Sequence, residues 1–179
     1  MVNHISVYSL TVEAGTALAR LVEQGRFALP DEDEVVWQYF ALRDLLEREG
    51  LHQYEVSNYA RPGCESRHNS RYWDRTPYLG LGPGAHSFDG QCRHWNNPDG
   101  TEGEELLTPA DAYNELLMTS LRTVRGLPLE AVPEGQKERL HRAMQPYVDC
   151  GWIERSDRFY RPTPEGLLHA DGMAAALFI

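Results

Sequence analysis

The pattern of apolar and polar positions in the first third of the chain predicts a strand, a helix and a second strand. Residues 4–10 alternate apolar with small polar side chains, as a buried strand does. Asp31 and Glu34 form a capping pair for a helix that ends at Gly50. Residues 51–60 return to a strand pattern. A strand, helix and strand at this spacing predict a parallel βαβ unit. Its strands are too few to close a barrel, so we expect the sheet to begin before residue 1.

The middle of the chain predicts a hairpin and then a linker. Asp89-Gly90 lies between two alternating runs, which is a hairpin signal. Residues 97–105 are rich in acids and glycine and read as a linker. We therefore expect two domains, residues 1–100 and residues 101–179.

The last part of the chain predicts helices around a small two-stranded wing. Thr108-Pro109 opens a helix, and a second helix covers about residues 135–149. Two short strands follow at 152–154 and 159–161, and a final helix runs from Thr163 towards Phe178. The expected fold class is α+β. An incomplete parallel βα barrel segment is followed by a small helical, winged-helix-like domain.

The stretch from Arg67 to Ser87 carries the densest chemistry. It begins with His68-Asn69-x-x-Tyr72-Trp73, which places an imidazole and an amide beside two large aromatic rings. Histidine is a common metal ligand, and aromatic rings supply flat apolar walls. Helical spacing would put His68 and Tyr72 on one face, although the preceding Pro62-Gly63 makes an extended loop equally compatible with the sequence.

The same stretch ends in a glycine run, Gly80-Leu81-Gly82-Pro83-Gly84-Ala85-His86. Glycine at alternate positions permits backbone conformations and close contacts that a side chain would prevent. A solvent-exposed loop is the alternative interpretation of this run.

Composition narrows the classes of partner and compartment. The formal net charge is -10, so a polyanion would be repelled unless basic residues cluster, and we do not expect nucleic acid as a partner. No apolar run is long enough to span a membrane, and the first residues lack the regions of a signal peptide. We expect a cytoplasmic protein without a transmembrane segment.

Three cysteines, Cys64, Cys92 and Cys150, are far apart in the sequence. Their number and spacing fit neither a disulfide framework nor a C-x-x-C metal site. Cys64 is the thiol nearest to His68. The other histidines, including His94, have no sequence neighbours that indicate a site, and we assign them no role.

Four blocks in order, HISVYSLTVE, YEVSNYARPG, RHNSRYW and YLGLGPGAHSF, resemble one family. The chain resembles the C-terminal half of the oxygen-independent coproporphyrinogen III oxidase-like radical SAM proteins, and the most similar branch is described as haem chaperones. The resemblance covers nearly the whole chain. It implies a missing N-terminal barrel half that binds a [4Fe-4S] cluster on a CxxxCxxC motif, together with S-adenosylmethionine. This chain has no such motif, so we expect a C-terminal fragment that is inactive alone.

The resemblance also implies roles for particular residues. His68, Asn69, Tyr72 and Trp73 match the family's haem-binding motif, with His68 as the ligand to the haem iron. Asn69 would orient His68 or bond a propionate, and the two aromatic side chains would wall the macrocycle. The glycine run through His86 matches the segment that closes the family's cavity, so Gly82, Gly84 and His86 are expected to line it. Thr11 and Glu13 are added from their position alone, because sites in α/β folds usually lie at the carboxyl ends of strands.

Three functions follow as hypotheses. The first is a haem chaperone that delivers haem or a related porphyrin to receiving proteins, with this half carrying the haem site. The second is an oxygen-independent coproporphyrinogen III oxidase of porphyrin biosynthesis. The third is a structural or interaction module without a ligand of its own. A barrel segment without its neighbours exposes strand edges, so we also expect the isolated chain to dimerise or aggregate.

Overall fold

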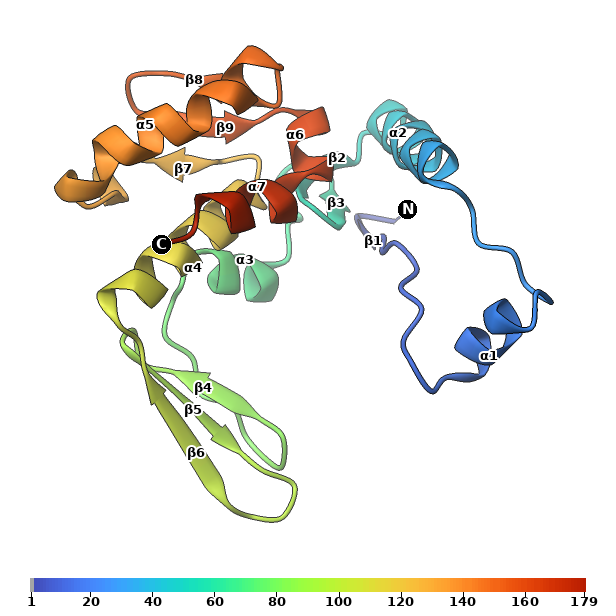
Figure 1. Ribbon diagram of the computed structural model, residues 1–179, viewed down its shortest axis with the longest axis horizontal. Helices are drawn as coiled ribbons and strands as arrows, with labels where there is room; N and C mark the ends of the chain where they lie inside the picture. The colour runs from blue at the N-terminus through green and yellow to red at the C-terminus, as the bar shows by residue number, and fades with distance from the viewer. Residues whose placement is uncertain (1) are drawn as a thin grey trace. The chain divides into compact units, whose positions relative to one another are not determined.

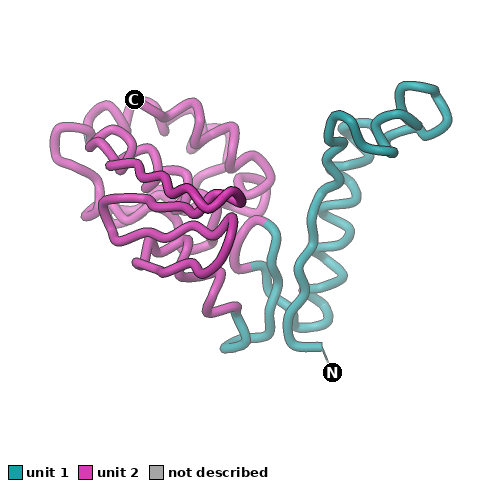
Figure 2. Tube along the Cα trace, turned by 90° about the horizontal axis from the view of Figure 1, so that it is seen from below, with its two compact units in different colours: residues 1–53, 57–65 teal, residues 54–56, 66–179 magenta. Residues whose placement is uncertain are grey.

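The computed structural model describes residues 2–179, which divide into two compact units. Unit 1 comprises residues 1–53 and 57–65, and unit 2 comprises residues 54–56 and 66–179 (Figure 2). The domain boundary near residue 100 stays a prediction.

Unit 1 contains the predicted helix, α2, and a shorter helix before it, α1. Helix α1, Ala17–Glu23, is capped by Thr16, and helix α2, Glu32–Arg48, is capped by Asp31, whose side chain accepts a hydrogen bond from the Glu34 N–H at 2.8 Å. The capping prediction for α2 is therefore confirmed. Its apolar face buries little, because only Leu46 falls in the buried class along the whole helix.

The strands of unit 1 depart from the prediction. Strand β1, His4–Ser6, is shorter than expected and only half-buried. Residues 51–60 form two strands, β2 at His52–Glu55 and β3 at Asn58–Ala60, separated by a two-residue turn. Strand β1 pairs with β3, and this pairing is antiparallel. The predicted single strand is thus wrong, as is a wholly parallel sheet, because the chain reverses at the turn before β3 reaches β1.

The core of unit 1 is small. Leu46, Leu51 and Tyr59 are buried together, and the half-buried Ile5 and Leu42 pack against them. The register places Ile5 opposite Tyr59 across β1 and β3. The strand pair and α2 therefore share one apolar contact surface.

Unit 2 contains a three-stranded antiparallel sheet in the order β4-β5-β6 (Figure 1). Strand β4 is His86–Phe88, β5 is Cys92–Asn96 and β6 is Glu102–Leu106. The Asp89-Gly90 hairpin is confirmed, and Gly90 supplies the positive φ of +107° that the turn requires. The predicted linker is wrong in its second half, since β6 pairs with β5 over its whole length.

The remainder of unit 2 holds the larger core. It is formed by α4 (Pro109–Leu121), β7 (Leu127–Pro128), the 3-10 turn η1 (Leu129–Ala131), α5 (Glu134–Asp149), β8 (Ile153–Arg155), β9 (Phe159–Pro162), α6 (Pro164–Leu168) and α7 (Ala170–Leu177). The strands make an antiparallel sheet in the order β7-β9-β8, with α5 along it and α7 beside α4 (Figure 1). The predicted wing thus gains a third strand, and the predicted last helix is two helices.

Twelve buried residues form this core, and most belong to the helices. They are Tyr113, Leu117, Leu121, Leu127, Val132, Leu140, Met144, Ile153, Tyr160, Met173, Ala174 and Leu177. Helix α4, which contributes to this core, begins at the predicted cap. There Thr108 accepts a hydrogen bond from the Asp111 N–H, and Asp111 accepts one from the Thr108 N–H. The Thr108 hydroxyl also donates to the Asp111 carboxylate at 2.7 Å, and this bond, together with the one from the Thr108 N–H, lowers the pKa of Asp111. Within residues 2–179, no helix is both long and apolar enough to cross a membrane.

Candidate functional site

The His-Asn-x-x-Tyr-Trp motif forms a short helix, α3, at Arg67–Trp73. Ser66 caps it by accepting a hydrogen bond from the Asn69 N–H at 3.2 Å. The helix ends at Trp73 with Asp74 as its C-cap, and the following Arg75 adopts a φ of +52°. Of the two local conformations compatible with the sequence, the chain thus takes the helix, which places His68 and Tyr72 one turn apart.

His68 begins a row of aromatic rings. Its imidazole contacts Tyr72 edge to face, with ring centroids 5.0 Å apart, and Tyr72 contacts Tyr78 at 4.9 Å. Tyr78 in turn lies 6.4 Å from the buried Phe88 of β4. The row therefore runs from an exposed imidazole to a buried phenyl ring.

His68 has an exposed side chain at the start of this row. His68 is exposed, and among residues 2–179 its imidazole has no hydrogen bond or ion pair. A histidine that serves only the fold is normally buried with its nitrogens bonded. The geometry of His68 is that of a side chain free to bind a ligand.

Arg67 and Arg71 flank His68 in the sequence, and both are exposed. Neither guanidinium has an ion pair or hydrogen bond in the described part of the chain. Guanidinium groups in this state can bind carboxylates in a two-point arrangement.

Trp73 faces different surroundings from Tyr72. The Arg122 guanidinium lies 5.3 Å from the centre of the Trp73 ring, and Trp73 Nε1 is buried without a hydrogen-bond partner among the described residues. Trp73 also lines a cavity of about 360 Å³ with Leu116 of α4 and Phe159 of β9. The structure thus groups His68 with Tyr72, and Trp73 with the α4 side of the helix. Asn69, also predicted for the site, is half-buried.

Three ion-paired residues connect helix α4 to the segment after α3 and to the β4-β5-β6 sheet. Glu115 of α4, whose side chain is 13% exposed, binds Arg75 at 3.2 Å and also binds Arg93 of β5. Arg75 in addition donates a hydrogen bond to the Ala112 carbonyl at 3.1 Å. Sequence reasoning did not find this anchor, because nothing local links residues 75, 93 and 115.

The glycine run forms a tight exposed turn. The Ala85 N–H donates to the Gly82 carbonyl at 3.2 Å, and Gly82 and Gly84 have φ values of +97° and +76°. Close approach occurs instead at Gly80, where an added Cβ would lie 2.2 Å from the His86 carbonyl oxygen. His86 itself stacks on Trp95 of β5 at 6.1 Å.

The remaining predicted cavity residues, Thr11 and Glu13, belong to unit 1, between β1 and α1. Both are exposed. The Glu13 carbonyl accepts a hydrogen bond from the Thr16 hydroxyl at 2.8 Å, next to the start of α1. Thr11 and Glu13 therefore belong to a different compact unit from His68, Gly82, Gly84 and His86.

Comparisons with known proteins give a consistent result. Residues 107–169 match the HemN C-terminal domain. The chain is 40% identical over 151 residues to "Heme chaperone HemW" of Mycobacterium tuberculosis (strain ATCC 25618 / H37Rv), covering 77% of this chain and 39% of that protein. It is 30% identical over 210 residues to the same-named protein of Synechocystis sp. (strain ATCC 27184 / PCC 6803 / Kazusa), covering 98% and 51%. This chain resembles the C-terminal half of a HemN-like radical SAM protein.

A solved structure supports the fold. Coproporphyrinogen III oxidase (HemN) from Escherichia coli superposes with a TM-score of 0.69 over 98% of this chain and 48% of that one, at 15% identity. The predicted resemblance is confirmed. Within it, the chain is similar to the haem chaperone branch, since the relatives at 30% and 40% identity are named HemW. The chain spans about two fifths to one half of the length of these HemW relatives.

Proposed function

We propose that this chain carries the haem-binding part of a haem chaperone, which takes up haem and passes it to receiving proteins. The relatives named "Heme chaperone HemW" support this assignment. The observation that carries it is His68, an exposed imidazole without a hydrogen bond or ion pair in the described residues, placed at the head of an aromatic row.

Each part of this surface suits one part of haem. A His68 nitrogen would bind the iron. Tyr72 and Tyr78 would contact the apolar face of the macrocycle, and Arg67 and Arg71 would bind the propionates. Tyr72 is 42% exposed, so haem bound against it would lie at the protein surface, which suits a protein that must also release its haem.

The [4Fe-4S] cluster implied by the family does not fit the residues present. A [4Fe-4S] cluster needs closely spaced thiolates, and the cysteines lie at positions 64, 92 and 150. We therefore assign the cluster to a part of the whole protein other than this chain, and no residue here is given a role towards the cluster or S-adenosylmethionine. Three further expectations stay proposals. They are a cytoplasmic location, self-association of the isolated chain and a winged-helix-like fold for its C-terminal end.

Coproporphyrinogen III oxidase activity is the second candidate for the whole protein. The similarity to the HemN structure favours it, but at 15% identity that similarity concerns the fold alone. A purely structural role for the motif is disfavoured by the open nitrogens of His68.

The test is a haem titration of this chain, followed by Soret absorbance, for the wild type and for His68→Ala. We expect saturable binding near one equivalent and a loss of at least about tenfold in affinity for the variant, or ~1.4 kcal/mol. His52→Ala is the matched control, because His52 is an exposed histidine of unit 1, outside α3.

Equal binding by the wild type and His68→Ala would contradict the proposed iron ligand. An absence of saturable binding would contradict a haem site in this chain.

A further inference from the structure

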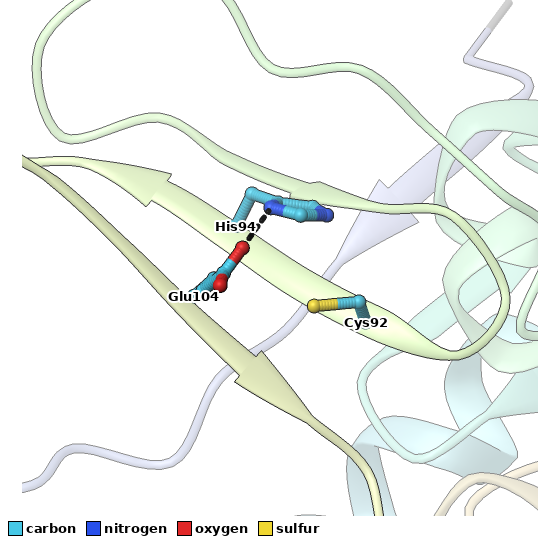
Figure 3. Close-up of side chains that lie close together, drawn as sticks. All are labelled: Cys92, His94 and Glu104. Carbon is cyan, nitrogen blue, oxygen red and sulfur yellow. Dashed lines mark ion pairs between the residues drawn. The ribbon is translucent and has the colours of Figure 1, made fainter.

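A second group of ligand-type side chains lies on strands β5 and β6, apart from helix α3. Cys92, His94 and Glu104 each direct one donor atom towards a common point (Figure 3). The three donor atoms all lie within 4.8 Å of one another, and His94 Nδ1 is 3.8 Å from Glu104 Oε2.

Strand register brings the three together. Cys92 and His94 are two residues apart on β5, so their side chains leave the same face of the sheet. Glu104 is the direct cross-strand partner of His94 on β6. Arg93 lies between them on the opposite face and pairs with Glu115 and Glu105, so its positive charge is directed away from Glu104.

The hairpin turn supports the imidazole from its other side. Asp89 Oδ1 accepts hydrogen bonds from the Gln91 and Cys92 N–H groups at 2.8 and 2.7 Å, which fixes the carboxylate. Its second oxygen, Oδ2, lies 3.7 Å from His94 Nε2. A metal-binding histidine commonly has a carboxylate at the ring nitrogen that does not bind the metal, and Asp89 occupies that place.

We propose that Cys92, His94 and Glu104 bind a zinc-like divalent cation, with the fourth position open to water or an external ligand. A thiolate, an imidazole and a carboxylate form a donor set that Zn²⁺ accepts, whereas Ca²⁺ and Mg²⁺ prefer oxygen donors alone. Donors around tetrahedral zinc lie roughly 3.5 Å apart, so small side-chain rotations bring these three to binding distance.

The surroundings are consistent with a cation. The thiol of Cys92 loses its proton on binding, so the site presents two negative charges from the ligands and a third from Asp89 nearby. Cys92 and His94 are half-buried and Glu104 is exposed, so a cation can enter from solvent.

The experiment uses the reduced chain without haem. Zn²⁺ affinity is measured by competition with a chromophoric chelator, and Co²⁺ is added separately as a spectroscopic probe. We expect one equivalent of each metal to bind, with a thiolate-to-cobalt charge-transfer band in the near ultraviolet. Cys92→Ser should abolish the band and weaken Zn²⁺ binding at least about tenfold.

Two further variants separate ligation from misfolding. His94→Gln and Glu104→Gln should each weaken Zn²⁺ binding by about tenfold or more while retaining the sulfur band at saturating Co²⁺. The matched controls are Cys64→Ser, which removes an exposed thiol elsewhere, and Glu102→Gln, two residues along β6. Far-ultraviolet circular dichroism checks that every variant keeps the native secondary structure.

Unchanged behaviour of both controls, together with losses in the three site variants, would support the site. The proposal would be overturned by a sulfur band that survives Cys92→Ser, by equal Zn²⁺ affinity in His94→Gln and the wild type, or by no Zn²⁺ binding at all.

Discussion

Two regions of unit 2 differ in how many of their side chains are buried: the helical end, residues 113–177, and the α3–β6 region, residues 66–106. Residues 113–177 place twelve side chains in one core, with Leu117, Leu140 and Met144 fully inaccessible. In the α3–β6 region Phe88 is the only residue in the buried class among residues 66–106, and the side chains with ligand chemistry are exposed or half-buried. Stability and binding thus use different parts of the same unit.

This contrast explains why the two regions should respond differently to substitution. A buried apolar side chain contributes through transfer from water and close packing. An exposed imidazole or thiol adds little to folding, but its donor atoms stay available. Variants of the first region should change the free energy of unfolding, whereas variants of the second should change ligand affinity.

The largest effect is expected for Leu140→Ala. Removal of this fully buried side chain leaves a cavity in the core, so the free energy of unfolding should fall by about 2–5 kcal/mol. Urea denaturation followed by circular dichroism measures it. Leu81→Ala is the control at a side chain that is 84% exposed, where a change below about 0.5 kcal/mol is expected. Similar losses of unfolding free energy in both variants would contradict the contrast between the buried core and the exposed region.

The next largest effect is expected for Gly126→Ala. Gly126 has a φ of +73°, and an added Cβ would lie 2.2 Å from the Tyr160 carbonyl oxygen. Backbone strain and overpacking together should cost about 2–3 kcal/mol in urea denaturation. Gly82→Ala has positive φ but open space around it, so only the strain of ~1 kcal/mol applies. A milder effect at Gly126 than at Gly82 would contradict the packing at this position.

A smaller effect, on affinity alone, is expected for the double variant Arg67→Ala/Arg71→Ala. Loss of two exposed guanidinium groups should weaken haem binding about fivefold, or ~1 kcal/mol, with no change in the denaturation midpoint. Haem dimethyl ester, which lacks the carboxylates, should bind the double variant and the wild type equally well. A loss of the same size with the ester would exclude propionate pairing.

The smallest effect is expected for Tyr160→Phe, on the stability of the folded chain at alkaline pH. Burial raises the pKa of Tyr160 above its ordinary value of 10.0, despite the Arg155 guanidinium 5.9 Å from the ring centre. A raised folded-state pKa means that this contribution to stability is complete below about pH 10 and is lost as pH rises through the folded-state value.

Tyr160→Phe should therefore reduce the alkaline loss of stability, measured as the urea midpoint at a series of pH values above neutrality. The hydroxyl also lies 2.6 Å from His141 Nδ1, so the variant should be less stable than the wild type at neutral pH. An identical alkaline profile for Tyr160→Phe and the wild type would show that this hydroxyl ionises equally in both states.

Local signals predicted the elements that local chemistry controls. The caps at Asp31 and Thr108, the Asp89-Gly90 hairpin and helix α5 all depend on residues within a few positions of one another. The resemblance to the HemN-like proteins was likewise readable from four short blocks. His68 was chosen from the same blocks, and its assignment to haem stays a proposal.

Long-range pairing was decided only by the tertiary structure. Strand β6 contains three acids and one glycine in five residues, so no apolar alternation marked it, and it forms because β5 offers a paired edge. That pairing places Glu104 opposite His94, a histidine without any signal in the sequence. The antiparallel pairing of β1 with β3 had the same origin. Sequence periodicity fixes which face of a strand is apolar, but the identity and direction of its neighbour depend on contacts across the whole fold.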